Sequence, residues 1–194
     1  MLQLHRDTLV EAFTLMKTIR DFEDRVHTEF ATGAIPGFVH LYAGEEASAV
    51  GVCLNLNDSD YIASTHRGHG HCIAKGCDVD GMMKEIYGRR DGLCGGKGGS
   101  MHIADLAKGM MGANGIVGGG PPLVCGAALS AKTLGTGGVA VASGRVADQS
   151  LLFAFQHRHV LPTKTTAPRL LLPHTTPVWA TGASAFISRR RFDD

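Results

Sequence analysis

The chain of 194 residues has the size of one domain, and its 44% hydrophobic and 19% charged residues exclude a wholly disordered chain, a collagen or a long coiled coil. Its 26 glycines are about twice the usual share, and 24 of them lie before position 141. Net charge changes at the same point, from −3 over residues 1–140 to +4 over residues 141–194. The overall charge of +1 therefore averages two unlike parts, and we expect no nucleic-acid partner.

The five cysteines indicate reduced thiols, because their number is odd, none has CxxC spacing and no signal segment precedes them. We therefore expect a cytoplasmic protein. The uncharged run 109–131 is long enough to span a bilayer, but it contains seven glycines and two prolines. We expect a loop followed by a helix there, and no membrane partner.

The first thirty residues are predicted to form one long amphipathic helix. Apolar residues recur at spacings of three and four from Leu9 to Phe30. Thr8 and Glu11 have the spacing of a capping box at the helix start, and Gly33 suits its end.

Shorter elements follow in chain order. A second helix is predicted at about 45–56 and a short strand at 61–64. Two short helices are expected at about 70–75 and 79–87, and Asp78 is placed to cap the second of them.

Residues 91–120 contain eleven glycines, which favours a functional loop over any regular element. Pro121 and Pro122 then begin a helix of small residues that runs to about Leu134. A buried strand is predicted at 139–142. This order is the α/β pattern, in which ligands gather at the carboxyl ends of parallel strands.

Two glycine-rich segments do not meet the requirements of known nucleotide loops. Residues 135–140 match GxGxxA but precede a strand, whereas a dinucleotide fingerprint follows one. Residues 95–100 resemble a phosphate loop, but Gly98 stands where a Walker loop needs Ser or Thr after Lys97. We predict neither kind of nucleotide site.

His66, His69, His71 and Cys72 are of the residue types that zinc prefers. A structural zinc site needs four ligands with defined spacing, and no second ligand pair follows downstream. We therefore predict no metal ligands. A zinc protein built on His66, His69 and Cys72 is the weakest interpretation, and it predicts stoichiometric zinc in the purified protein.

Arg67 is the stronger candidate for binding, because its planar donor fork suits phosphate oxygens and flanking glycines let backbone approach a ligand. A second segment, 112–120, places one apolar wedge, Ile116 and Val117, between glycines with accessible backbone groups. Such a segment can hold a flat heterocycle by main-chain hydrogen bonds, whereas a flexible linker is richer in Ser and polar residues.

Taken together, these motifs resemble the alpha subunit of the thiamine diphosphate-dependent dehydrogenase component of 2-oxo acid dehydrogenase complexes. Within that family the resemblance is to bacterial acetoin dehydrogenase first, with the pyruvate and branched-chain 2-oxo acid enzymes next. The motifs lie in the family's order at 37–41 (GFVHL), 44–47 (GEEA), 64–70 (STHRGHG), 96–102 (GKGGSMH) and 112–118 (GANGIVG).

The resemblance implies the N-terminal part of the α/β thiamine diphosphate-binding fold, with a parallel sheet flanked by helices. It also implies roles for particular residues. The catalytic residues would be His40 and His69. The cofactor-binding residues would be Phe38, His66 (tyrosine in relatives), Arg67 at the diphosphate, and Gly115 and Val117 at the aminopyrimidine ring. Ser100 and His102 would lie in the loop beneath the cofactor.

The implied activity is that of an oxidoreductase that cleaves a C–C bond next to a carbonyl and passes the acyl unit to a lipoyl group on an acyltransferase. The resemblance further implies a beta subunit, which supplies the glutamate that activates the cofactor, and an α2β2 heterotetramer. Several of the residues that choose acetoin or pyruvate belong to that beta subunit, so this sequence leaves the substrate open.

The chain departs from the family after the strand at 139–142. The family there has Gly-Asp-Gly and a later Asn-Asn, whose Asp and Asn hold magnesium, but residues 143–149 read SGRVADQ and no asparagine follows Asn114. An arginine at a ligand position opposes a magnesium ion. We therefore expect residues 1–142 to be the N-terminal part of the alpha-subunit domain, and residues 143–194 to be an aberrant, poorly ordered tail. A shifted reading frame or a misassembled end is the first hypothesis for residues 145–194.

Two main interpretations result. The leading one is an incomplete alpha subunit that is inactive by itself. The alternative is a catalytically inactive module that pairs with the beta chain or another alpha chain and binds no cofactor. Calorimetry with thiamine diphosphate and magnesium distinguishes them, and for the chain by itself we expect no heat of binding.

Overall fold

The computed structural model describes residues 5–116, 118–146 and 149–156. Its centre is a sheet with the strand order β2-β1-β3-β4. The strands are β1 (Tyr61–Ala63), β2 (Met110–Gly112), β3 (Val139–Val146) and β4 (Gln149–Gln156). Strand β1 is parallel to β2 and to β3, whereas β4 is antiparallel to β3. The predicted α/β fold with a parallel sheet is confirmed.

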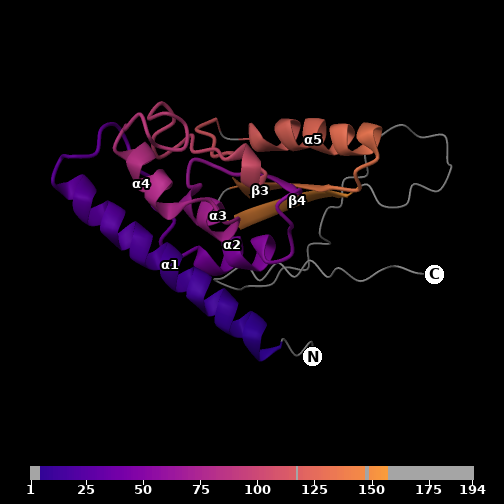
Figure 1. Cartoon of the computed structure of the whole chain (residues 1–194), viewed down its shortest axis with the longest axis horizontal. Helices are drawn as coiled ribbons and strands as arrows, with labels where there is room; N and C mark the ends of the chain where they lie inside the picture. Colours follow the sequence, from indigo (N-terminus) through magenta and orange to yellow (C-terminus); the bar gives the residue numbers. More distant parts are fainter. Residues whose placement is uncertain (1–4, 117, 147–148, 157–194) are drawn as a thin grey trace.

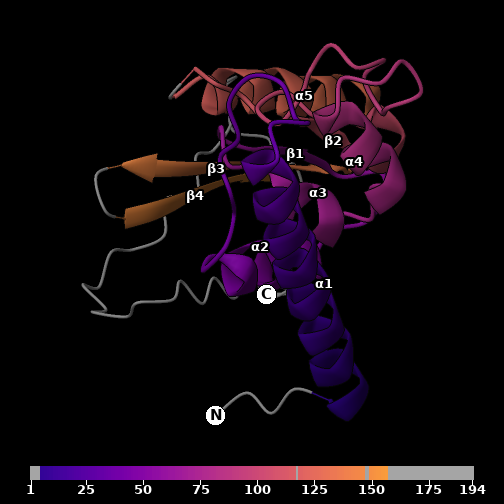
Figure 2. The same cartoon turned by 90° about the vertical axis from the view of Figure 1, so that its left-hand side faces the viewer.

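Helices α1 (Arg6–Ala31), α2 (Glu46–Cys53) and α3 (His69–Ala74) pack together below the sheet in Figure 1, and α5 (Gly120–Leu134) covers the opposite face. Figure 2 shows the same two layers from the side. Successive strand residues point to opposite faces. Ile62 and Val141 therefore join the core made with α1 to α3, whereas Ala63, Ala140 and Ala142 pack against α5.

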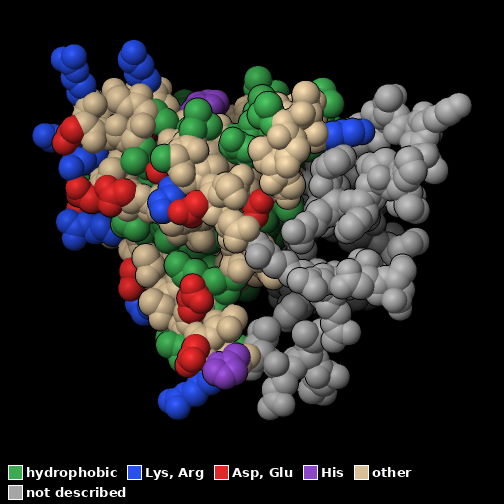
Figure 3. Space-filling view, turned by 45° about the vertical axis from the view of Figure 1, so that its right-hand side comes forward, with side chains coloured by type: hydrophobic (Ala, Val, Ile, Leu, Met, Phe, Trp, Pro, Cys, Tyr) green, Lys and Arg blue, Asp and Glu red, His purple; other side chains and the backbone are tan. Residues whose placement is uncertain are grey.

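The α5 face of the sheet is built from small side chains. Val124, Ala127 and Ala128 of the helix pack against the strand alanines. The prolines at the start of α5 and the left-handed Gly135 at its end confirm the predicted helix. Outside this contact, Leu123, Leu129 and Leu134 are 45%, 55% and 75% exposed, and hydrophobic side chains reach the surface at the top of Figure 3.

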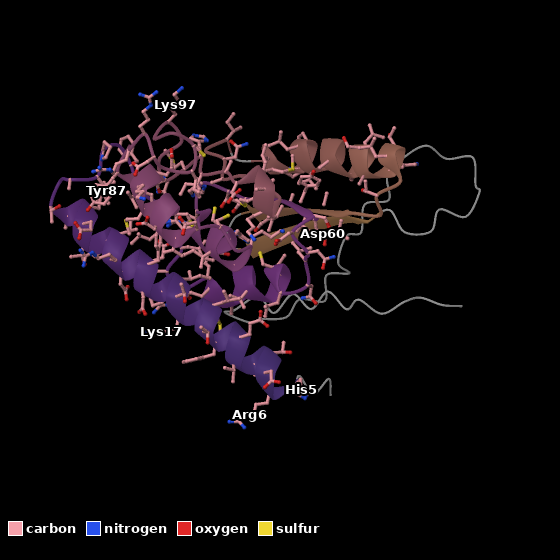
Figure 4. The ribbon with its side chains drawn as sticks, viewed as in Figure 1. His5, Arg6, Lys17, Asp60, Tyr87 and Lys97 are labelled. Atoms are coloured by element: carbon pink, nitrogen blue, oxygen red, sulfur yellow. The ribbon has the colours of Figure 1, made fainter. Side chains whose placement is uncertain are left out.

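Helix α1 is confirmed, but its predicted capping box is wrong. The helix begins after His5, which makes no side-chain capping bond, so Thr8 already lies inside the helix. Gly33, with φ +79°, follows the helix end as predicted. The same end of α1 is held by Tyr87, labelled in Figure 4, whose hydroxyl donates to Glu29 at 2.6 Å.

Helix α4 (Val79–Ile86) has the predicted cap, because the Asp78 carboxylate accepts the backbone N–H of Gly81 at 2.8 Å. Helix α2 ends earlier than predicted, at Cys53. Residues 91–120 were expected to hold no regular element, and this is wrong for the 3-10 helix η1 (Leu106–Lys108) and for strand β2.

Strand β2 was missed because it has only three residues and lies among glycines. Gly109, with φ +71°, precedes it, and a side chain there would lie 2.0 Å from the carbonyl oxygen of Asp60. The glycine therefore permits the close approach that aligns β2 with β1. Asp60, labelled in Figure 4, also accepts the backbone N–H of Val139 at 2.8 Å, which ties the start of β1 to β3.

Strand β3 continues past residue 142 to Val146 and pairs along its whole length with β4. Residues 147–148 and 157–194 lie outside the described residues, so the expected tail at 143–194 stays a prediction. Within the described ranges, no helix combines the length and the apolar character that crossing a bilayer requires.

Candidate functional site

The loops that follow β1 and β2 lie side by side at the carboxyl edge of the sheet. The backbone N–H of Asn114 donates to the carbonyl oxygen of Thr65 at 3.2 Å. Gly68 approaches so closely that a side chain there would lie 2.5 Å from Cβ of Ala113. The structure therefore brings together the two segments that the sequence predicts to bind one ligand.

Helix α5 begins at the same edge. A side chain on Gly120 would lie 3.7 Å from Cβ of Ala63 and 3.9 Å from the carbonyl oxygen of Ser143. The first backbone N–H groups of a helix lack partners within the helix and carry partial positive charge. The ends of β1 and β2, Ser143 within β3 and the start of α5 thus share one region that suits an anion.

Arg67 links this edge to the loop that carries Phe38 and His40. Its Nη1 donates to the carbonyl oxygen of Leu41 at 2.6 Å. The neighbouring His66 ring lies edge-on to the His40 ring, with centroids 5.0 Å apart. Within the described part of the chain, no carboxylate forms an ion pair with Arg67. Its planar donor fork is of the kind that suits phosphate or carboxylate oxygens.

The second predicted segment is shaped by a side-chain turn. Asn114 Oδ1 accepts the backbone N–H of Ile116 at 2.9 Å. Gly115 faces His102, whose ring atoms would lie 3.4 Å from a side chain at position 115. Ile116 is 72% exposed and Phe38 is 75% exposed, so both apolar groups are available for contact. Val117 lies outside the described residues.

His69 has a different environment from the other predicted residues. It is fully buried, with Nδ1 2.9 Å from Oε1 of Glu23 and Nε2 2.9 Å from Oγ of Ser100. Ser100 Oγ also accepts the backbone N–H of His40 at 3.4 Å. Both ring nitrogens of His69 therefore have protein partners, and its catalytic role stays a prediction.

His71 is a buried histidine with two partners. Its Nδ1 lies 2.9 Å from Oγ of Ser64, and its Nε2 lies 3.5 Å from the hydroxyl of Tyr42. Complete burial lowers the pKa of His71 to about 4, so it is neutral at pH 7.

Sequence reasoning missed Glu85, which organises the glycine-rich loop beside the site. This fully buried carboxylate accepts four backbone N–H groups at 2.7–3.1 Å, from Cys94, Gly96, Gly98 and Gly99. Burial raises its pKa, but the four donors outweigh burial and hold the pKa below its usual value. The signal was present in the sequence as a carboxylate on the apolar face of α4, beside Met82 and Ile86.

The residues that the structure describes contain no group of three or more His, Cys, Asp or Glu side chains that could hold a metal ion. The zinc interpretation relied on a triplet of this kind. Of its three members, His69 and Cys72 are fully buried, and His69 is taken up by Glu23 and Ser100.

The fold and the site define an α/β protein whose predicted binding residues meet at the carboxyl edge of its parallel strands. The arginine and the helix start at this edge suit an anionic group. The family described as dehydrogenase E1 component matches residues 14–144. The chain belongs to this family, which confirms the resemblance found in its motifs.

The relatives carry more specific names. The chain is 66% identical over 140 residues to the alpha subunit of acetoin:2,6-dichlorophenolindophenol oxidoreductase from Cupriavidus necator, and equally to that from Bacillus subtilis. It is 41% identical over 133 residues to the pyruvate dehydrogenase E1 component subunit alpha of Rhizobium meliloti. The matches cover 72%, 72% and 69% of this chain, but 42%, 42% and 38% of the relatives. The chain thus spans about two fifths of the length of these relatives.

Proposed function

We propose that this chain is the N-terminal part of the alpha subunit of a thiamine diphosphate-dependent dehydrogenase that acts on acetoin or a 2-oxo acid. The observation that carries the proposal is the meeting of motifs from 37–41, 64–70, 96–102 and 112–118 at one edge of the sheet. The acetoin enzyme's alpha subunit, at 66% identity, favours acetoin as the first substrate to test.

In this proposal the cofactor lies along the carboxyl edge. Arg67 and the start of α5 would bind its diphosphate, and the backbone of residues 114–116 would bind its aminopyrimidine ring. When bound, thiamine diphosphate supplies the electron sink for cleaving a C–C bond next to a carbonyl. Phe38 and His40 would shield and orient the substrate at the opening of the site, and the acyl unit would pass to a lipoyl group.

A beta subunit is part of the proposal. Helix α5 exposes three leucines and carries Lys132 as its single charged residue, which supports contact with another chain. A cytoplasmic α2β2 assembly with a lipoyl acyltransferase follows from the family relationship and stays a prediction.

Magnesium does not fit the residues at this position. Where the family has a Gly-Asp-Gly motif, β3 carries Ser143, Gly144 and Arg145, which offer no carboxylate to the ion. No step of the proposed chemistry is assigned to magnesium. The same observation favours the second candidate function, a subunit-interaction module without cofactor.

The experiment is calorimetric titration of thiamine diphosphate and magnesium into the chain, alone and combined with an acetoin dehydrogenase beta subunit. Binding by the combined chains, weakened at least tenfold by Arg67→Ala and unchanged by the exposed control Arg90→Ala, supports the enzyme. Co-elution with the beta subunit without any heat of cofactor binding supports the interaction module and refutes the enzyme.

A further inference from the structure

Glu23, in the middle of α1, has a buried carboxylate whose two oxygens differ in their surroundings. Oε1 lies 2.9 Å from Nδ1 of His69, and both side chains are fully buried. Oε2 is buried and has no hydrogen-bond partner among the described residues. A buried carboxylate oxygen without a partner costs folding free energy, so packing alone does not account for a glutamate here.

The contacts of His69 extend from α1 to the candidate site. An ionised carboxylate only accepts hydrogen bonds, so with Glu23 ionised the donor in this contact is Nδ1–H of His69. Nε2 faces the Ser100 hydroxyl at 2.9 Å, and the Ser100 oxygen accepts the backbone N–H of His40 at 3.4 Å. A series of hydrogen bonds through Glu23, His69 and Ser100, which lie far apart in the sequence, thus ends at the backbone N–H of His40.

We propose that Glu23 is a positioning residue, which fixes the protonation of His69 and thereby holds Ser100 and the His40 loop at the cofactor edge. His69 then also acts by positioning, because its ring is fully buried and both nitrogens are occupied. The link to the cofactor rests on the function proposed above, whereas the order of hydrogen bonds can be tested without cofactor.

The first test uses nuclear magnetic resonance on the full chain, with the His69 ring signals assigned from a His69→Gln variant. The proposal expects a proton on Nδ1 of His69 in the unchanged protein. Glu23→Gln retains an acceptor oxygen and is expected to retain this state, whereas Glu23→Leu, of similar volume, is expected to lose it. Asp21→Asn, at an exposed carboxylate on the same helix, is the control and should change nothing.

The second readout is hydrogen exchange of the His40 amide. Ser100→Ala removes the acceptor, so exchange is expected to be about fivefold faster while the proton stays on Nδ1 of His69. Glu23→Leu is also expected to speed this exchange, and in addition to remove the proton from Nδ1 of His69. A merely structural role for Glu23 predicts no change in ring protonation.

The proposal is overturned if His69 in the unchanged protein lacks the proton on Nδ1, or if Ser100→Ala leaves His40 exchange unchanged. Both results are accessible even if Glu23→Leu does not fold. In the complex with a beta subunit, Ser100→Ala is expected to weaken thiamine diphosphate binding about fivefold. If the unchanged complex does not bind thiamine diphosphate but the resonance results are as expected, the proposed function is refuted and the positioning role of Glu23 is not. If the unchanged complex and the Ser100→Ala complex bind the cofactor equally, the positioning of the site is refuted.

Discussion

Replacing Glu85 with alanine is expected to release the glycine-rich loop at residues 94–99 from α4. Four backbone N–H groups donate to this one carboxylate, so its removal leaves all four without their acceptor. Each such bond contributes about 1 kcal/mol net, and partial access of the loop to water reduces the loss. We expect the free energy of unfolding to fall by about 2–4 kcal/mol.

The assay is urea unfolding followed by circular dichroism, with Asp80→Asn as the matched control on α4. The Asp80 side chain is 74% exposed, so its substitution should change stability by less than about 0.5 kcal/mol. Limited trypsin digestion adds a local readout, because Lys97, at the top of Figure 4, lies inside the held loop. A local loss of about 2 kcal/mol corresponds to cleavage about 30-fold faster.

The pH dependence of the same carboxylate has a defined sign. The pKa of Glu85 in the folded chain lies below its ordinary value of 4.5, so folding favours the ionised form. Its contribution to the free energy of unfolding is fully present above about pH 4.5 and is lost as pH falls through the lower folded pKa.

Unchanged stability and unchanged trypsin cleavage in Glu85→Ala would refute the reasoning, as would an equal effect in Asp80→Asn.

Three further predictions concern packing, helix propensity and protonation. Gly70→Ala is expected to lower stability by about 1–3 kcal/mol, because a side chain there would lie 2.1 Å from the Tyr42 ring. Gly126→Ala, on the open face of α5, should raise stability by about 0.5–1 kcal/mol in the same urea assay, and a loss there would contradict the exposed helix face. His71 has a folded pKa of about 4, below the ordinary 6.5, so protonation of the unfolded chain should reduce stability as pH falls from about 6.5 to 4. His71→Gln should flatten this part of the stability profile, and an equal slope in both proteins would show that another group titrates.

The candidate site divides into residues that sequence reasoning could name and residues that it could not. Arg67, His40 and Gly115 stand in local motifs, and each motif is readable within a few neighbouring positions. Glu23 and Glu85 have no such motif. Each is a carboxylate on the apolar side of an amphipathic helix, where an unpaired charge is unfavourable. A carboxylate at such a position was the signal in the sequence that the side chain has a buried partner.

The sequence by itself determined the family, helices α1 to α5 with strands β1 and β3, and local features such as the Asp78 cap, because these depend on residues a few positions apart. Only the tertiary structure decided which partners meet across the chain. Glu23 and His69 are 46 positions apart, and Thr65 meets Asn114 only because β1 and β2 are parallel neighbours. Such contacts depend on how helices pack on the sheet and on the register of its strands, and neither property is encoded within a local stretch of sequence.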